Sequence, residues 1–245
     1  NGVAESTIVL LRSLLEEESP VPPALHARMR SLILEYTVVG GMPDAVQSFV
    51  DARDMAKALS IQRDIVGGYE DDMVKYAPSA DKPLIKQCFK SIPRQLAKEN
   101  KKFQYSLVKK GSTASRFAGG LQWMEDAGIT LRCRNFSLTE LPLDGNALEG
   151  QFKVYMADTG LFTSMLEDGT QFDILNGDLL GYKGAVFENL IADVFSKMGR
   201  RLYYFRKDSG LELDFVIRCR GKCVPVEGKS TDGNAKSVKT VLKHS

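Results

Sequence analysis

The stretch GLELDFVIRCRGKCVPVEGKS, residues 210–230, decides the fold of the last third of the chain. It places two apolar, strand-like runs on either side of Arg220-Gly221. Glycine readily takes the positive φ that a two-residue hairpin turn requires. The pattern therefore predicts an antiparallel hairpin in which Cys219 pairs with Lys222.

This register gathers polar side chains on one face of the hairpin. Directly opposed residues of an antiparallel pair share a face, and side chains repeat every two positions. Asp214 then lies opposite Glu227, and Glu212 lies opposite Lys229. The apolar side chains expected on the other face are Phe215, Ile217 and Val226.

A helix is predicted just upstream, over residues 181–199, and a further strand over residues 200–209. Glu188 falls on the flank of the apolar stripe of this helix, so we expect its carboxylate to point toward the body of the domain. The stripe itself consists of Val186, Phe187, Leu190, Ile191, Val194 and Phe195.

Three carboxylates that converge from a helix and two strands repel one another unless a cation or a proton intervenes. Oxygen ligands suit Mg²⁺ or Mn²⁺, so Glu188, Asp214 and Glu227 are candidate metal ligands. Lys229 beside them could orient a water molecule and stabilise charge on a phosphate. The chemistry indicated is metal-assisted phosphodiester hydrolysis. The alternative is a solvent-facing hairpin with ion pairs such as Glu212–Lys229, each contributing about 0.2–1 kcal/mol.

The first third of the chain is predicted to be helical, over residues 7–18, 24–40 and 55–77. We expect the last of these helices to be interrupted or bent at Gly67-Gly68. The step Gly40-Gly41-Met42-Pro43 is interpreted as a bend, because it lacks the Lys-Ser/Thr pair of a triphosphate loop.

The middle segment has the element order of a winged helix. Residues 82–100 predict a helix, a break at Pro93 and a second short helix, and residues 106–129 predict a third helix closed by Gly128. Strands over residues 129–138 and 150–158 would form the wing. In this fold the third helix can enter a major groove while the wing touches the backbone. The predicted contacts are Lys109, Lys110, Arg116, Arg132 and Arg134; the alternative is a winged helix that only packs against its neighbours.

The charge distribution supports a nucleic-acid partner for the middle segment. The whole chain of 245 residues carries a net charge of only +2. Residues 82–134 carry +9 and residues 216–245 carry +5, whereas residues 1–81 and 135–215 carry −6 each. A basic block of this kind is either a phosphate-backbone footprint or a solvated helical surface.

Composition also bounds the compartment. Four scattered cysteines are too few for a disulfide framework, and no apolar run is long enough to cross a bilayer. We expect a cytoplasmic protein without a membrane partner.

Several motifs, in order, resemble the C-terminal region of prokaryotic AAA-type ATPases of the archaeal-type group, from about Leu32 to the end. They are VVGGMPDAV, SIPRQLAKENKKFQYS, LQWMEDAGI, FKVYMADTGLF, KGAVFENLIADVF and LELDFVI followed by VPVEGKS. The order Glu188, Asp214, Glu227, Lys229 resembles the PD-(D/E)XK, restriction-endonuclease-like superfamily. The resemblance implies a P-loop ATPase domain upstream, then a winged helix and a nuclease-like core.

The chain also departs from these patterns. It has no G-x-x-x-x-G-K-[ST] motif, so ATP would bind only to an absent upstream domain. Gly228 stands where the lysine motif has an apolar residue. The chain stops soon after this motif, so we expect a truncated nuclease-like domain.

The sequence therefore predicts an α/β (α+β) protein in three parts. These are a helical segment over residues 1–80, a winged-helix-like segment over 81–160, and a restriction-endonuclease-like domain with a mixed sheet over 161–245. The first functional hypothesis is a Mg²⁺- or Mn²⁺-dependent DNA nuclease that works with the upstream ATPase domain. In it Asp214 and Glu227 bind the metal, Glu188 assists as ligand or base, and Lys229 orients the water. The alternatives are an inactive nuclease-like module that binds DNA or a partner protein, and a purely structural part of the ATPase.

Overall fold

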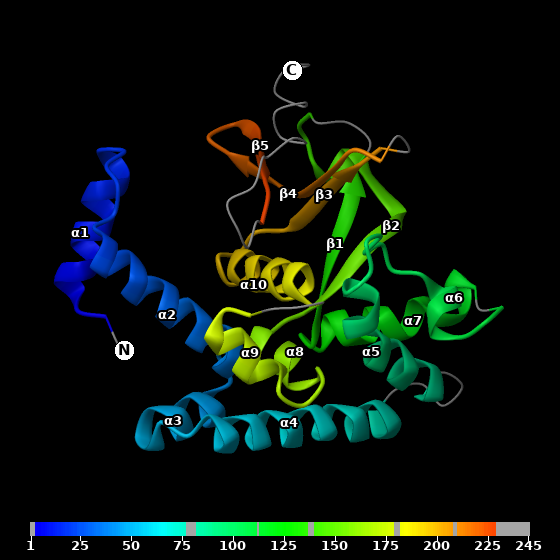
Figure 1. Ribbon diagram of the computed structural model, residues 1–245. Coiled ribbons are helices and arrows are strands. Elements are labelled where there is room, and N and C mark those ends of the chain that lie inside the picture. The colour runs from blue at the N-terminus through cyan, green and yellow to red at the C-terminus, as the bar shows by residue number, and fades with distance from the viewer. Residues whose placement is uncertain are drawn as a thin grey trace.

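A computed structural model describes residues 3–76, 82–111, 113–136, 140–178, 182–207 and 210–228. Within these residues ten α-helices and five strands form a mixed α/β fold, which confirms the predicted fold class (Figure 1). None of the described helices combines the length and the apolar character that a membrane span needs.

The N-terminal helices lie to one side of the sheet and below it in the view of Figure 1. They are α1 (Glu5–Glu16), α2 (Pro23–Val39), α3 (Pro43–Ala52) and α4 (Met55–Tyr76). Helix α1 has no buried residue and stands apart from the body. Helix α4 runs through Gly67-Gly68 without the predicted interruption, and added Cβ atoms there would meet nothing within 4 Å.

The middle segment contains three helices followed by two strands, but they are not the predicted three: the two helices predicted over residues 82–100 form one, and the helix predicted over residues 106–129 is divided into two. The helices are α5 (Lys82–Leu96), α6 (Tyr105–Val108) and α7 (Ala114–Asp126). The predicted break at Pro93 is wrong, because α5 continues through it. Proline removes one backbone donor. At this place, in the last turn, that loss is outweighed by burial of Phe89, Ile92 and Leu96.

The five strands form one sheet in the order β2-β1-β3-β4-β5. The strands are β1 (Thr130–Phe136), β2 (Ala147–Met156), β3 (Leu202–Arg206), β4 (Glu212–Cys219) and β5 (Lys222–Val226). A short 3-10 helix, Asp144–Asn146, precedes β2. Strands β1 and β3 are parallel and the other pairs are antiparallel. The sheet therefore runs continuously across the predicted segments 81–160 and 161–245.

Three helices connect β2 to β3: α8 (Thr159–Ser164), α9 (Thr170–Asn176) and α10 (Lys183–Lys197). Helix α10 packs against β1, β2 and β3. Its buried face differs from the predicted stripe, because Val194 is 41% exposed while Glu188, Asn189 and Asp193 are buried. This helix thus carries a polar row toward the protein interior.

The β4–β5 hairpin has the predicted register. Cys219 pairs with Lys222 across a turn in which Arg220 and Gly221 both have positive φ (48° and 76°). This pairing continues to Phe215 opposite Val226.

The pairing of β3 with β4 shifts by one residue. Tyr203 lies opposite Val216 but Phe205 lies opposite Leu213, so Asp214 and Phe215 both face Tyr204. Such a bulge lets two successive side chains share one side of a sheet. Phe215 accordingly packs on Phe195 of α10, on the side that also holds the carboxylates, instead of on the opposite layer as predicted.

Candidate functional site

A cluster of lysines and carboxylates lies where α10 packs on the sheet. We call it the lysine–carboxylate cluster, and its members come from the α5–α6 loop, β2, α10 and β4. They are Lys101, Lys153, Tyr155, Glu188, Glu212 and Asp214. The cluster contains two of the predicted catalytic carboxylates and two lysines that sequence reasoning did not single out.

Glu188 of α10 is 3% exposed and fully engaged. One carboxylate oxygen is paired with the Lys101 Nζ. The other accepts from the Tyr155 OH at 2.9 Å and is paired with the Lys153 Nζ at 3.2 Å. Burial raises the pKa of Glu188, but Lys153 and Lys101 outweigh burial and hold the pKa below its ordinary value. Glu188 is therefore a carboxylate whose charge the protein itself neutralises.

Lys153 of β2 is the centre of the cluster. Its side chain is 1% exposed, and its Nζ lies 2.7 Å from Glu212 Oε1 and 4.9 Å from the centroid of the Tyr204 ring. Burial lowers the pKa of Lys153, but the adjacent Glu188 and Glu212 raise it above the ordinary value. A buried charge is tolerated only when it is paired and hydrogen-bonded, so this lysine and its carboxylates depend on one another.

Asp214 is the least satisfied carboxyl of the cluster. Its Oδ2 accepts the backbone N–H of Gly228 at 3.0 Å. Burial and the negative charge of Glu188 raise the pKa of Asp214 to about 6. Glu212, two residues earlier, accepts a second cation, the Arg206 Nη1, at 3.0 Å.

Of the two remaining predicted catalytic residues, Glu227 lies within the described part of the chain. Glu227 is half-buried directly after β5, whose pairing with β4 ends at Val226 opposite Phe215. Lys229 lies outside the described residues. Its predicted role stays a prediction.

As they stand, the described carboxylates do not fit a divalent cation. Within residues 3–228, apart from the short undescribed gaps, no group of three His, Cys, Asp or Glu side chains is arranged so that it could hold a metal ion as the side chains stand. Both oxygens of Glu188 already face ammonium groups, which repel a second cation. The predicted Mg²⁺ or Mn²⁺ therefore has no ready-made ligand set here.

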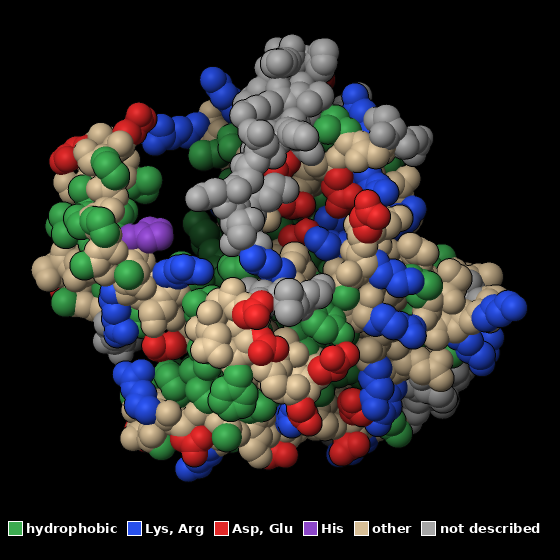
Figure 2. Space-filling view, in the orientation of Figure 1, with side chains coloured by type: hydrophobic (Ala, Val, Ile, Leu, Met, Phe, Trp, Pro, Cys, Tyr) green, Lys and Arg blue, Asp and Glu red, His purple; other side chains and the backbone are tan. Residues whose placement is uncertain are grey.

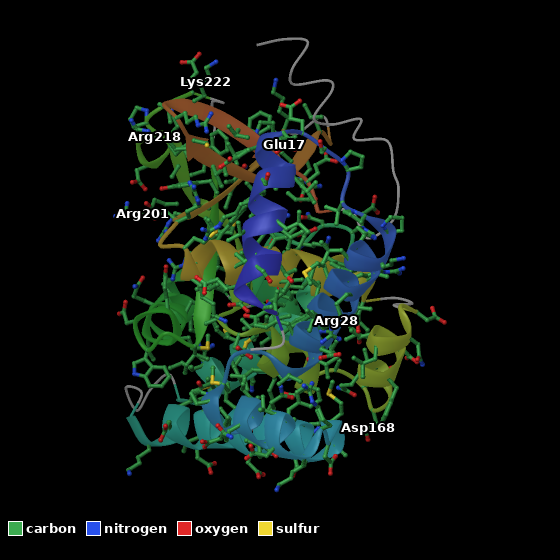
Figure 3. All side chains as sticks on the ribbon, turned by 90° about the vertical axis from the view of Figure 1, so that its left-hand side faces the viewer. Glu17, Arg28, Asp168, Arg201, Arg218 and Lys222 are labelled. Atoms are coloured by element: carbon green, nitrogen blue, oxygen red, sulfur yellow. The ribbon has the colours of Figure 1, made fainter. Side chains whose placement is uncertain are left out.

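Lys153 could not be recognised from the sequence pattern, because its segment of β2 shows no alternation of buried and exposed residues. The run Phe152–Met156 is buried at every position, so the sequence pattern does not show toward which side of the sheet each side chain points. The available signal was a single lysine inside an unbroken buried run, since lysine is almost never fully buried unless it is paired. Other cations of the sheet, Arg201, Arg218 and Lys222, point outward (Figure 3).

Two protein families match this chain, and residues of both matched regions form the lysine–carboxylate cluster. Residues 30–171, more than half of the chain, match the family described as Domain of unknown function (DUF8612). The chain belongs to this family. Residues 183–245 match a second one, Domain of unknown function (DUF4143), which is often found in C-terminal regions of AAA-type ATPases. A comparison with curated proteins gives no match, and a comparison with solved structures gives none.

The two matched regions contribute opposite charges to the cluster. The lysines, Lys101 and Lys153, belong to the DUF8612 region. All three carboxylates, Glu188, Glu212 and Asp214, belong to the DUF4143 region. The cluster is thus an electrostatic contact between the two regions.

A second polar contact joins the same regions at the α2–α3 turn. Asp158 accepts the N–H of Gly41 at 2.6 Å and that of Leu161 at 2.9 Å. On α10, Asp193 accepts from the Tyr36 OH at 3.1 Å and is paired with Lys197 at 2.8 Å. Asp193 also accepts the N–H of Thr159 at 3.2 Å, so three motifs of the AAA-type resemblance, VVGGMPDAV, FKVYMADTGLF and KGAVFENLIADVF, meet in one structural junction.

The predicted nucleic-acid contacts fall into two groups in the DUF8612 region. Lys109, Lys110 and Arg116 are exposed near α6 and the start of α7, and Figure 2 shows lysine and arginine side chains gathered on the side of the molecule where these helices lie. Arg132 and Arg134 instead turn toward Glu125, at 3.0 and 3.7 Å. Their guanidinium charges are partly neutralised within the protein.

Proposed function

We propose that this chain is a non-cleaving, nuclease-like module that binds DNA and works with an AAA-type ATPase. The observation that carries the proposal is the engagement of both Glu188 oxygens by Lys101 and Lys153. A metal-dependent nuclease needs carboxylate oxygens that are available to the cation. In this chain Lys101 and Lys153 occupy the positions around Glu188 that a metal ion would take. The cations near α6 and α7, in contrast, are exposed to solvent.

DNA is the favoured partner because of the exposed cations near α6 and α7. Neutralisation of phosphates by lysine and arginine supplies most sequence-independent affinity for nucleic acid. Lys109, Lys110 and Arg116 lie in the segment that the sequence predicts to be a winged helix. The frequent occurrence of DUF4143 in AAA-type ATPases supports an ATPase domain of the same polypeptide as the second partner.

Fluorescence anisotropy with a labelled DNA duplex across a salt series tests the binding. We expect affinity to fall steeply with salt, and the variant Lys109→Gln/Lys110→Gln/Arg116→Gln to lower the log–log salt slope by about 2–3. The control variant removes three exposed cations on α1, α2 and α4: Arg12→Gln/Arg28→Gln/Lys57→Gln. Equal weakening by both variants, or no binding by the wild type, would contradict DNA binding through this surface.

A second candidate function is the Mg²⁺-dependent DNA nuclease, with Asp214 and Glu227 as metal ligands, Glu188 as accessory ligand or base, and Lys229 orienting the water. The hairpin register favours it, because Asp214 and Glu227 are the next residues beyond its last pair, Phe215 and Val226. Calorimetric titration with Mn²⁺ separates the candidates. Binding by the wild type that is lost in Asp214→Ala/Glu227→Ala, together with cutting of DNA, establishes the nuclease; no binding and no cutting support the non-cleaving module.

A further inference from the structure

The lysine–carboxylate cluster combines acidic groups of one region with basic groups of another. The carboxylates sit on α10 and β4, and the ammonium groups come from β2 and from the loop before α6. Three acidic side chains face two lysines and Arg206. Their charges are therefore balanced without an added ion.

We propose that the Lys153 ammonium occupies the place of a divalent cation, and that the DUF8612 region thereby keeps metal away from the carboxylates of the DUF4143 region. The inference rests on the non-cleaving half of the proposed function. It goes further by naming the residue that excludes the metal and the region that supplies it.

The contacts of Lys153 are those that a central cation makes. Its Nζ lies 2.7 Å from a Glu212 oxygen and 3.2 Å from a Glu188 oxygen, so it bridges carboxylates from a strand and a helix. The Tyr204 ring lies beneath it at 4.9 Å, and a cation is attracted to the face of an aromatic ring. Asp214 is close enough for the charges of Glu188 and Lys153 to shift its proton affinity.

The side chain of Lys153 is also held in the cluster by the strand that carries it. Its side chain is 1% exposed and rises from a strand that pairs with β1 through its whole buried length, including Lys153 opposite Cys133. Lys101, which is 17% exposed, covers the other oxygen of Glu188 from a loop. A divalent ion would have to approach both ammonium groups at close range, where like charges repel strongly in a buried site.

Removal of Lys153 should convert the cluster into a metal site. In Lys153→Met, the pair Glu188 and Glu212 loses its central cation and Asp214 stays nearby. We expect a lower Tm in the presence of chelator and a rise of about 5 °C or more when Mn²⁺ exceeds its dissociation constant roughly 100-fold. The wild-type Tm should not respond to Mn²⁺. Calorimetric titration should show at least tenfold tighter Mn²⁺ binding by the variant than by the wild type.

Two further variants locate the effect. Lys197→Met removes a lysine that pairs with buried Asp193 outside the cluster, and should leave the protein unresponsive to Mn²⁺. Lys153→Met/Glu212→Gln removes both members of the closest pair, and so keeps the test available if the single variant fails to fold. It should bind Mn²⁺ more weakly than Lys153→Met but more tightly than the wild type.

The outcomes separate this inference from the proposed function. Mn²⁺ binding and DNA cutting by the wild type overturn both. A wild type that neither binds Mn²⁺ nor cuts DNA, with lysine variants that gain no Mn²⁺ response, overturns the role of Lys153 alone. Equal Mn²⁺ responses in the Lys153 and Lys197 variants also overturn it, because the effect would not belong to the cluster.

Discussion

Asp214 illustrates how burial sets the chemistry of a single residue. The hydrogen bond from the Gly228 N–H favours the charged form of its carboxyl. Burial and the negative charge of Glu188 oppose the charged form. The opposing effects prevail and the pKa rises to about 6. Asp214 is therefore a residue whose ionisation at neutral pH costs free energy of folding.

Asp214→Asn should stabilise the protein at pH 7.5 and not at pH 4. The folded-state pKa of about 6 lies above the ordinary 3.8, so the folded protein binds the proton more tightly. Stability from this group is present below pH 3.8 and is lost as pH rises through 6. Urea denaturation should show a gain of about 1–3 kcal/mol at pH 7.5 that disappears near pH 4.

Asp144→Asn is the matched control, with the opposite sign. Hydrogen bonds from Tyr203 and Arg201 lower the pKa of this surface carboxyl, so its contribution is present at neutral pH and is lost as pH falls. The control should destabilise at pH 7.5. Gains of equal size for Asp214→Asn at both pH values would contradict the assignment of its pKa.

At the residue level, the sequence predicted the turn better than the site. Arg220-Gly221 sets the hairpin register, because the turn needs positive φ at both positions and the pairing follows from it. The bulge that brings Asp214 and Phe215 to one side could not be predicted, since it depends on the pairing with β3. Lys153 was missed because its partners lie on α10 and β4, which are distant in the sequence.

At the scale of elements, glycine has two different roles in the helical part. Gly40 ends α2 with φ 68° and ψ −154°, a conformation open essentially to glycine alone. A Cβ there would contact Asp158 Oδ1 and approach Gly160 Cα to 2.8 Å. Gly67 and Gly68 lie in the continuous helix α4 with open space around them. The same residue type is thus required at one site and replaceable at the other.

Gly40→Ala should destabilise the protein by roughly 2–5 kcal/mol, through backbone strain and crowding at the α2–α8 contact. Gly67→Ala and Gly68→Ala should each stabilise by about 0.5–1 kcal/mol, because alanine is the better helix former. Chemical denaturation of the three variants checks this. A neutral Gly40→Ala would show that the α2–α3 turn can move away from Asp158.

The elements themselves were predictable where local pattern decides. Helices α1, α2 and α4, strands β1 to β5 and α10 appear close to their predicted positions, because each has a distinct apolar period or turn signal. The prediction of a helix break at Pro93 was wrong, because buried neighbours such as Phe89 and Ile92 stabilise α5 across the proline. Tertiary packing overrode a local rule there.

At the scale of the whole molecule, the matched regions share one sheet and one charge cluster. Strand β1 of the first region pairs in parallel with β3 of the second, and α10 packs on β2. Local sequence patterns cannot predict a parallel pairing between strands so far apart in the chain. The segments 1–80, 81–160 and 161–245 remain a prediction that an unfolding experiment can test.

We expect the whole chain to unfold in one calorimetric transition, and residues 182–245 alone to show none. Without residues 1–178, β3 lacks its partner β1, and Glu188 and Glu212 face each other without Lys153. Loss of one partner of a buried ion pair typically costs about 3–5 kcal/mol, a large part of the stability of a small domain. Mixing fragments 1–178 and 182–245 should restore a cooperative transition. Two separate transitions, each reproduced by its own fragment, would instead show that the two regions fold independently and that the cluster forms only after both have folded.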